Sequence, residues 1–335
     1  MKARRFIRRR AALVSALCLI FTAGILTAAV LSLSKIGTFT VAAHVELQRS
    51  MLVAEGVAAR VQWLLAADRN LNPDDKPGSV EYEAFEYDRF MADGVEHELD
   101  YYGETVRVQV FDAVSGWDMS ASGYASVLSS IASQEDAGED IVTLCDEVSQ
   151  LIADYLDSDD NIREQGMEAG DYEDALQSPL PRNGAMLFRE ELLYIRGLTD
   201  LIPLDPDGRL SAVRLIPPAG TGTLEGTPSL FSVTREEVKL RLNDLDDDGI
   251  DNIMDALKRW RTDKVLLSES LDKETLNRLY SEFSTSESGA YTVVISGPRG
   301  TEKRRPFRKL VFTYAGFEIS GPTDRMLKYM EWNFL

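Results

Sequence analysis

The sequence predicts an α+β fold in which a long N-terminal transmembrane helix packs on a small antiparallel or mixed sheet, with a large, mostly helical domain inserted. Three observations support this class. An uncharged run leads without a turn signal into an apolar stripe of helical spacing. Alternation typical of strands appears at 105–112 and then only after residue 289. The residues between these segments, about 120–285, show mostly helical patterns.

The first element is a membrane-spanning helix. The run from Ala11 to Ser34 holds 24 residues without a charge, which as a helix reach about 36 Å and can cross a bilayer core. Six basic residues precede it and favour a cytoplasmic N-terminus with the body exported. We therefore predict a single membrane span at 12–34 with the N-terminus in the cytoplasm. A cleaved secretory signal peptide is the alternative, although its apolar core usually has only about 7–15 residues.

The same helix is expected to continue into the soluble part, because no turn cluster follows the apolar run. Its apolar residues recur at every third or fourth position, which places them on one side of a helix. They are Ile36, Phe39, Ala43, Leu47, Met51, Ala54, Ala58, Val61 and Leu65. Asn70 and the Asn72–Asp75 cluster then stop the helix. The prediction is one helix from about residue 11 to about residue 67.

The later elements are a strand, helices and three further strands. Thr105–Asp112 alternates as a half-buried strand and runs into a turn at 113–116. Apolar residues from Ile141 to Leu156 share one face of a helix, and Asn183-Gly184 is a turn signal. Gly197 suits the left-handed position beyond a helix at 188–198, whose Leu192, Leu193 and Ile195 are expected in the core. Strand patterns then return at 290–296, 307–314 and 327–333, with a basic connection at 299–305.

The charge distribution excludes some functions. The formal net charge is −19, yet residues 1–35 contain seven basic residues and no acid, so the other 300 residues carry −26. So acidic a body repels phosphate backbones, which argues against nucleic-acid binding and favours divalent cations or basic partners. Cys18 and Cys145 are too few and too far apart for a thiolate cluster, and neither His44 nor His97 begins a zinc-protease motif. The sequence therefore predicts no enzyme.

The N-terminal arrangement resembles the type IV pilin and pseudopilin family. In that family a short basic leader precedes a hydrophobic helix, which anchors the precursor and later packs inside a filament. The usual leader ends in Gly, where a prepilin peptidase cuts, and Glu stands at the fifth mature position. The resemblance implies a leader at 1–11 and processing between Ala11 and Ala12. Here Ala11 replaces the Gly, and Ala16 stands where the Glu is usual.

The motifs of the body, in their order, are similar to the K-type family of minor pseudopilins (general secretion pathway protein K, GspK) of the type II secretion system. They are the strand at 105–112, the acidic helix end at 155–160, Glu168–Tyr172, Pro181–Gly184 and Glu191–Gly197. The resemblance implies a pilin-like α/β domain, built from 35–119 and 286–335, around the insertion at 120–285.

The same resemblance implies a non-enzymatic protein at the tip of the pseudopilus, with I- and J-type minor pseudopilins as partners. It would assist pseudopilus assembly and secretion across the outer membrane. Two alternatives stay open. One is a membrane-anchored, extracytoplasmic calcium-binding interaction module unrelated to secretion, and the other is an exported hydrolase that uses its carboxylates.

A calcium loop is the sharpest local motif. Compared with the 12-residue EF-hand loop, residues 244–255 have acids at positions 1, 3, 5 and 12, Gly at 6 and Asn at 9. Alternate oxygens must converge on the ion, and the carbonyl of residue 250 would supply position 7. The predicted Ca²⁺ ligands are Asp244, Asp246, Asp248, Ile250, Asn252 and Asp255. A solvated acidic turn between helices is the alternative.

A second acidic cluster follows the helix that ends near Leu156. Its members are Asp154, Asp157, Asp159, Asp160, Glu164 and Glu168, and their spacing fits no fixed template. Calcium binding is known in the K-type family, so the resemblance makes this cluster a candidate second site. A solvated helix end explains it equally well.

Overall fold

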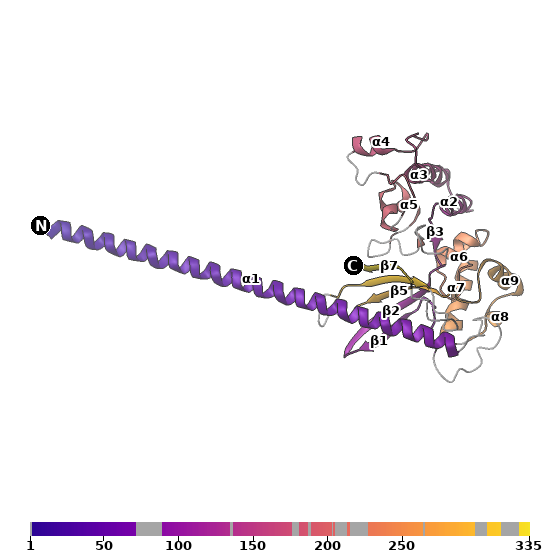
Figure 1. The fold of residues 1–335 in the computed structure, drawn as a ribbon, viewed down its shortest axis with the longest axis horizontal. Coiled ribbons are helices and arrows are strands. Elements are labelled where there is room, and N and C mark those ends of the chain that lie inside the picture. Colours follow the sequence, from indigo (N-terminus) through magenta and orange to yellow (C-terminus); the bar gives the residue numbers. More distant parts are fainter. Residues whose placement is uncertain are drawn as a thin grey trace.

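The computed structural model describes residues 2–71, 89–134, 137–175, 181–186, 189–202, 204, 213–214, 227–263, 265–298, 307–315 and 328–335. The stop at Asn72–Asp75 and the basic connection at 299–305 lie outside these residues. The helix α1 (Lys2–Leu71) has 70 residues and extends far beyond the folded body, which surrounds its C-terminal end (Figure 1). Its length is therefore about 105 Å.

The two halves of α1 have different surroundings. Its N-terminal half is long and apolar enough to be a candidate membrane anchor, and its side chains from Ser15 on are exposed. Ala54, Ala58, Val61 and Leu65 are buried against the sheet, as predicted. Ile36 and Phe39 are 61% and 73% exposed, so the domain does not cover the whole length of the apolar stripe. The apolar spacing of three or four residues extends toward the N-terminus of α1, but the domain contacts α1 only from about Ser50 onward.

A five-stranded antiparallel sheet covers α1. Its order is β1 (Glu96–Tyr101), β2 (Glu104–Asp112), β5 (Ala290–Ser296), β6 (Leu310–Ala315) and β7 (Lys328–Phe334). The predicted strands are thus confirmed as β2 and β5–β7, with ends that shift by up to three residues. The strand β1 was not predicted, because charged residues interrupt its apolar positions. Val108, Val293, Phe312 and their neighbours form the core between the sheet and α1.

The first part of the insertion has its own core. It contains β3 (Trp117–Asp118), α2 (Tyr124–Ala132), α3 (Glu139–Leu156), α4 (Ala169–Asp174), η1 (Arg189–Tyr194), α5 (Leu198–Leu201) and β4 (Val213–Arg214). The strands β3 and β4 pair in parallel. Leu151, Ile152 and Leu192 are among the side chains that fill this core.

The second part of the insertion forms another core. Its helices are α6 (Arg235–Arg241), α7 (Asp247–Asp263), α8 (Leu267–Ser270) and α9 (Lys273–Glu282). Trp260 of α7 packs against Phe231 with 4.0 Å between the ring centroids, and both are buried. The helices α7–α9 lie at the end of the molecule opposite the N-terminus (Figure 1). The insertion therefore contains two hydrophobic cores, where helical periodicity alone indicated only a helical domain.

The segment at 188–198 differs from its predicted helix. Residues 189–194 form a 3-10 helix, and Gly197 has φ of 81°, the left-handed conformation predicted for it, but a further helix, α5, follows at once. Leu192 and Ile195 are buried, whereas Leu193 is 37% exposed, so its assignment to the core is wrong. Three residues per turn place 192 and 195 on one side and turn 193 away from it.

A buried carboxylate joins the sheet to the second part of the insertion. Asp112 is 1% exposed and its carboxylate accepts hydrogen bonds from Val114 N (2.9 Å), Ser288 N (2.6 Å) and Ser288 Oγ (2.7 Å). The backbone N–H of Asp112 donates to Ser232 Oγ at 3.2 Å. Burial raises the pKa of Asp112 above its usual value despite these donors.

Candidate functional site

The predicted calcium loop is mostly helical. The helix α7 begins at Asp247, so Asp248, Ile250, Asn252 and Asp255 all lie on it. The Asp246 carboxylate accepts a hydrogen bond from Gly249 N at 2.8 Å, as a residue that caps a helix N-terminus does. Asp244 forms an ion pair with Arg278 of α9.

The structure does not bring the six predicted ligands together. Helical geometry turns successive side chains by about 100°, and the backbone carbonyl of Ile250 belongs to the same helix. Among the described residues, no three acidic, histidine or cysteine side chains are placed to hold one metal ion. The apolar positions of Ile250, Ile253 and Leu257 already showed the helix in the sequence. Calcium binding by this segment stays a prediction.

The second acidic cluster gathers around an arginine. Asp154 is fully buried, and its carboxylate accepts a hydrogen bond from the Arg163 backbone N–H at 3.1 Å and pairs with the Arg163 guanidinium. The same Nη1 donates to Asp157 Oδ2 at 2.6 Å. Asp159 accepts a hydrogen bond from Asn161 N, which stabilises the turn between them. Arg163 therefore holds Asp154 and Asp157 together at the end of α3.

Glu168 stands at the edge of this group, and its backbone N–H donates to Asp171 Oδ2 at 3.0 Å. It is 4% exposed, and both carboxylate oxygens are buried with no hydrogen-bond partner in the described residues. Oδ1 of Asp157 is likewise buried with no hydrogen-bond partner in the described residues. Burial raises the pKa of Glu168, and repulsion by Asp154 and Asp157 raises it further. Asp160 and Glu164 are exposed to solvent. The cluster therefore contains buried oxygen atoms with unused capacity to accept a hydrogen bond or a cation.

An exposed apolar stripe on α1 was missed in the sequence. It consists of Val45, Leu52, Ala59 and Trp63, which we call the outer stripe; Val45, Leu52 and Trp63 are 58%, 68% and 67% exposed. Seven residues return an α-helix to within about 20° of the same side, so these positions share the side that faces away from the sheet. The seven-residue interval between Val45 and Leu52 could have indicated this stripe in the sequence. It was overlooked because α1 also carries many apolar residues that face the sheet.

The predicted processing site lies within the helix. Ala11 and Ala12 are both part of α1. Cleavage between them stays a prediction.

The comparisons with known proteins give one informative result. No family profile and no curated protein sequence matches the chain. A search of solved structures matches a chain of the crystal structure of the GspK–GspI–GspJ complex of the type 2 secretion system of enterotoxigenic Escherichia coli. The alignment covers 86% of this chain and 97% of that chain, at 11% identity and a TM-score of 0.50. The chain is therefore similar in fold to a component of that complex, and this likeness confirms, at the level of fold, the GspK-like architecture that the sequence predicts.

Proposed function

We propose that this protein is a minor pseudopilin of a type II secretion system. It would be anchored in the inner membrane by the N-terminal half of α1, with its N-terminus cytoplasmic and its body in the periplasm. It would act without catalysis, at the pseudopilus tip together with I- and J-type minor pseudopilins, to assist pseudopilus assembly and protein secretion. The fold shared with a chain of the GspK–GspI–GspJ complex is the observation that carries this proposal.

Two further features support a position at the tip. In the major pseudopilins, the early Glu is thought to neutralise the N-terminal amine of a neighbouring subunit inside the apolar filament, where an unpaired charge is costly. Ala16 offers no such partner, which suits a subunit with none above it. The two-core insertion, at the end of the body remote from the N-terminus, would obstruct the addition of another subunit (Figure 1).

The outer stripe supports a helical partner. Side chains that recur at intervals of seven and four residues along one side of a helix suit packing against a second helix. Ala59 would permit a close approach, and Trp63 offers a large apolar surface of the kind that dominates binding energy in protein interfaces. The stripe faces away from the sheet, so a partner could contact it without disturbing the core of this protein.

The first prediction tests this partner surface. In the double variant Leu52→Glu plus Trp63→Glu, co-purification of the full-length protein with its I- and J-type pseudopilins is expected to fall at least about tenfold, because two charges would be buried without partners. The measurement is the amount of each partner recovered from membranes with the tagged protein. Tyr102→Glu, in the turn between β1 and β2, changes an aromatic residue that is 89% exposed and should keep recovery unchanged. Equal recovery with the double variant would exclude the stripe as the interface.

We also propose that the second acidic cluster binds Ca²⁺. Calcium prefers carboxylate oxygens, and Glu168 and Asp157 hold such oxygens without a hydrogen bond. Asp154 would be the third ligand. Because no three carboxylates of the described residues are already placed to hold one ion, these side chains would have to move toward it and displace Arg163 from Asp154 and Asp157. An ion in this cluster would offset the repulsion between carboxylates and compete with the guanidinium. Its contribution would be structural, since it would hold the end of α3 and the start of α4 together.

The second prediction concerns this ion. Calcium at millimolar concentration is expected to raise the melting temperature of the wild type, and Glu168→Gln should abolish that rise. Without calcium, Glu168→Gln should be at least as stable as the wild type, because it removes a buried, unpaired charge. Arg163→Gln should bind Ca²⁺ more tightly, since it removes the competing cation. Calcium titration calorimetry and thermal unfolding of the full chain measure these effects.

The calcium loop candidate provides the matched control. Asp244→Asn plus Asp248→Asn leaves the second cluster intact, so the part of the calcium response that belongs to this cluster should remain in that variant. If this pair abolishes calcium binding while Glu168→Gln does not, the ion belongs to the 244–255 segment instead. If calcium binds but the I- and J-type partners do not, the protein is better explained as a membrane-anchored calcium-binding interaction module unrelated to secretion.

A further inference from the structure

A row of buried polar side chains crosses the face of the sheet that packs on α1. Residues that pair in register on neighbouring strands share one face, and Asp112 of β2 pairs with Tyr291 of β5, which pairs with Tyr314 of β6. Glu287, in the turn before β5, joins this row, because its Oε2 accepts a hydrogen bond from the Tyr291 hydroxyl at 2.7 Å. Its Oε1 accepts one from Ala92 N at 2.7 Å. Two carboxylates, of Asp112 and Glu287, therefore belong to one cluster.

Arg69, near the C-terminal end of α1, brings a positive charge to this cluster. Its guanidinium lies so close to Gly289 that any side chain on residue 289 would clash with it. Gly289 also has φ of 85°, a conformation that favours glycine. Arg69 Nη1 donates to the Tyr291 hydroxyl at 3.4 Å, while the neighbouring Asp68 is paired with Arg89 at 2.8 Å. The turn before β5 is therefore shaped to receive this arginine.

The two carboxylates outnumber this cation. Burial raises the pKa of Asp112, and burial together with repulsion by Asp112 raises the pKa of Glu287, although Arg69 lowers both. Burial also raises the pKa of Tyr291 and of Tyr314, so both phenols stay neutral at neutral pH. Protons that enter this cluster on mild acidification therefore go to the two carboxylates.

We propose that Arg69, Asp112 and Glu287 form a proton-sensitive clasp between α1 and the body. While the carboxylates are ionised, Arg69 holds the last turn of α1 to the turn before β5, and this attraction is lost when they are protonated. Because the pKa of each carboxyl is raised by folding, its own contribution to stability is present at low pH and is lost as the pH rises. Acidification therefore loosens the clasp without unfolding the domain. The clasp lies within one chain, so it does not depend on the proposed role in secretion.

The test is a double-mutant cycle of Arg69→Gln and Glu287→Gln in the full-length protein, measured by urea unfolding at about pH 7.5 and about pH 5.5. At the higher pH, Arg69→Gln should raise the unfolding equilibrium constant at least about tenfold in the wild-type background and at most about threefold beside Glu287→Gln. At the lower pH, it should change that constant by less than about twofold in both backgrounds. The amide keeps a donor for Tyr291, so the difference reports the charge.

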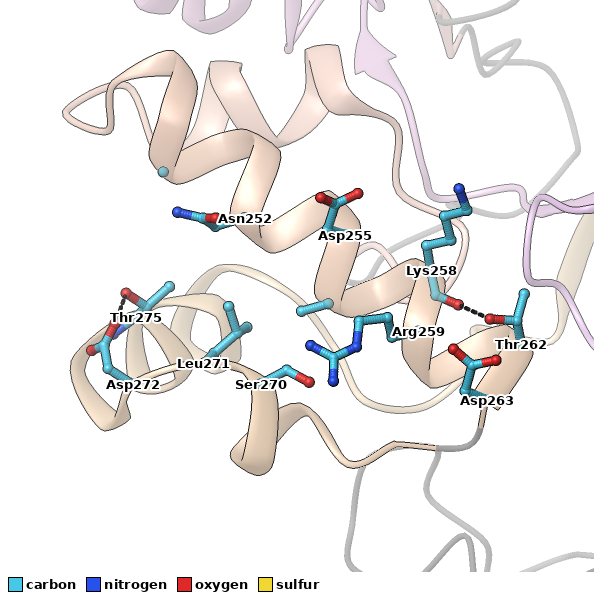
Figure 2. A pocket seen from close by; sticks show the side chains of 12 residues that line it. Asn252, Asp255, Lys258, Arg259, Thr262, Asp263, Ser270, Leu271, Asp272 and Thr275 are labelled. Atoms are coloured by element: carbon cyan, nitrogen blue, oxygen red, sulfur yellow. Dashed lines mark hydrogen bonds between the residues drawn. The ribbon is translucent and has the colours of Figure 1, made fainter.

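Two control variants separate the clasp from other effects. Arg60 also lies on α1, but it donates to the backbone carbonyl of Asp100 at 2.5 Å, an acceptor that does not titrate. Arg60→Gln should therefore have the same effect at both pH values. Asp255→Asn removes an exposed carboxylate from the wall of the groove in Figure 2, and it should leave the pH dependence of stability as in the wild type.

Hydrogen exchange, corrected for the intrinsic effect of pH, shows where the protein opens. In the wild type, the backbone amides of residues 68–71 should lose protection between about pH 7.5 and about pH 5.5, whereas those of residues 57–61 should keep it. In Arg69→Gln, the amides of residues 68–71 should be equally unprotected at both pH values. The proposal is overturned if Arg69→Gln has the same cost at both pH values, or if it has no cost at the higher one.

Discussion

Replacing Asp112 by alanine is expected to lower the free energy of unfolding by about 3–5 kcal/mol. Its carboxylate accepts hydrogen bonds from Val114 N, Ser288 N and Ser288 Oγ, and the alanine would leave these donors without an acceptor in a buried setting. The loss should affect both the sheet and the second part of the insertion, because Ser232 and Ser288 connect them at this residue. Urea unfolding of the full chain, followed by tryptophan fluorescence, measures it.

The matched control for Asp112 is Glu98→Ala. Glu98 is exposed on β1, and its removal should change the free energy of unfolding by no more than about 0.5 kcal/mol. Asp112→Asn should fall between the two, because an amide keeps one acceptor oxygen but turns an NH₂ toward the remaining donors. If Asp112→Ala is as stable as Glu98→Ala, the buried network does not hold the two parts together.

The second large effect is expected for Glu191→Ala, which should cost about 2–4 kcal/mol. Glu191 is 5% exposed and forms a bidentate ion pair with Arg182, with Nε and Nη2 each at 2.7 Å from a carboxylate oxygen. It also accepts a hydrogen bond from the Tyr155 hydroxyl at 3.1 Å. Its loss would leave Arg182 unpaired and detach the turn at Pro181–Gly184 from the first core of the insertion.

A double-mutant cycle distinguishes this ion pair from general packing. Arg182→Ala in the Glu191→Ala background should cost much less than in the wild type, because the partner is already gone. Glu164→Ala, an exposed acid of the neighbouring cluster, is the control and should be nearly neutral. Equal costs for Arg182→Ala in both backgrounds would show that the two side chains do not interact.

Patterns within a single element predicted much of the fold. The uninterrupted helix, the strand at 105–112 and the strand at 290–296 follow from spacing that is visible over a few residues, and the structure contains all three. The predicted burial of individual side chains failed where it depended on the extent of the domain along α1 or on the local type of helix. Leu193 became exposed because its segment is a 3-10 helix, and Ile36 is exposed because the domain begins farther along α1.

For the candidate sites too, spacing in the sequence predicted the motif, while tertiary packing decided its conformation. The acids of residues 244–255 have the spacing of a calcium loop, but most of them lie on a helix, because the apolar face with Ile250 and Leu257 packs into a core. The members of the second cluster have no template in sequence. Asp154 and Asp157 meet only because both pair with Arg163, and Glu168 at the start of α4 comes near enough for their charges to raise its pKa.

The sequence by itself determined the long apolar N-terminal helix, the acidic body, the mostly helical segment between the strands and the resemblance to the K-type pseudopilins. These depend on composition, on periodicity and on the order of short motifs. Only the tertiary structure decided that the insertion has two cores, that the Glu168 carboxylate is buried and that α1 keeps an outer apolar stripe. The reason is physical. Burial and pairing depend on which distant segments meet, and the spacing of residues within one segment does not identify the segment that it contacts.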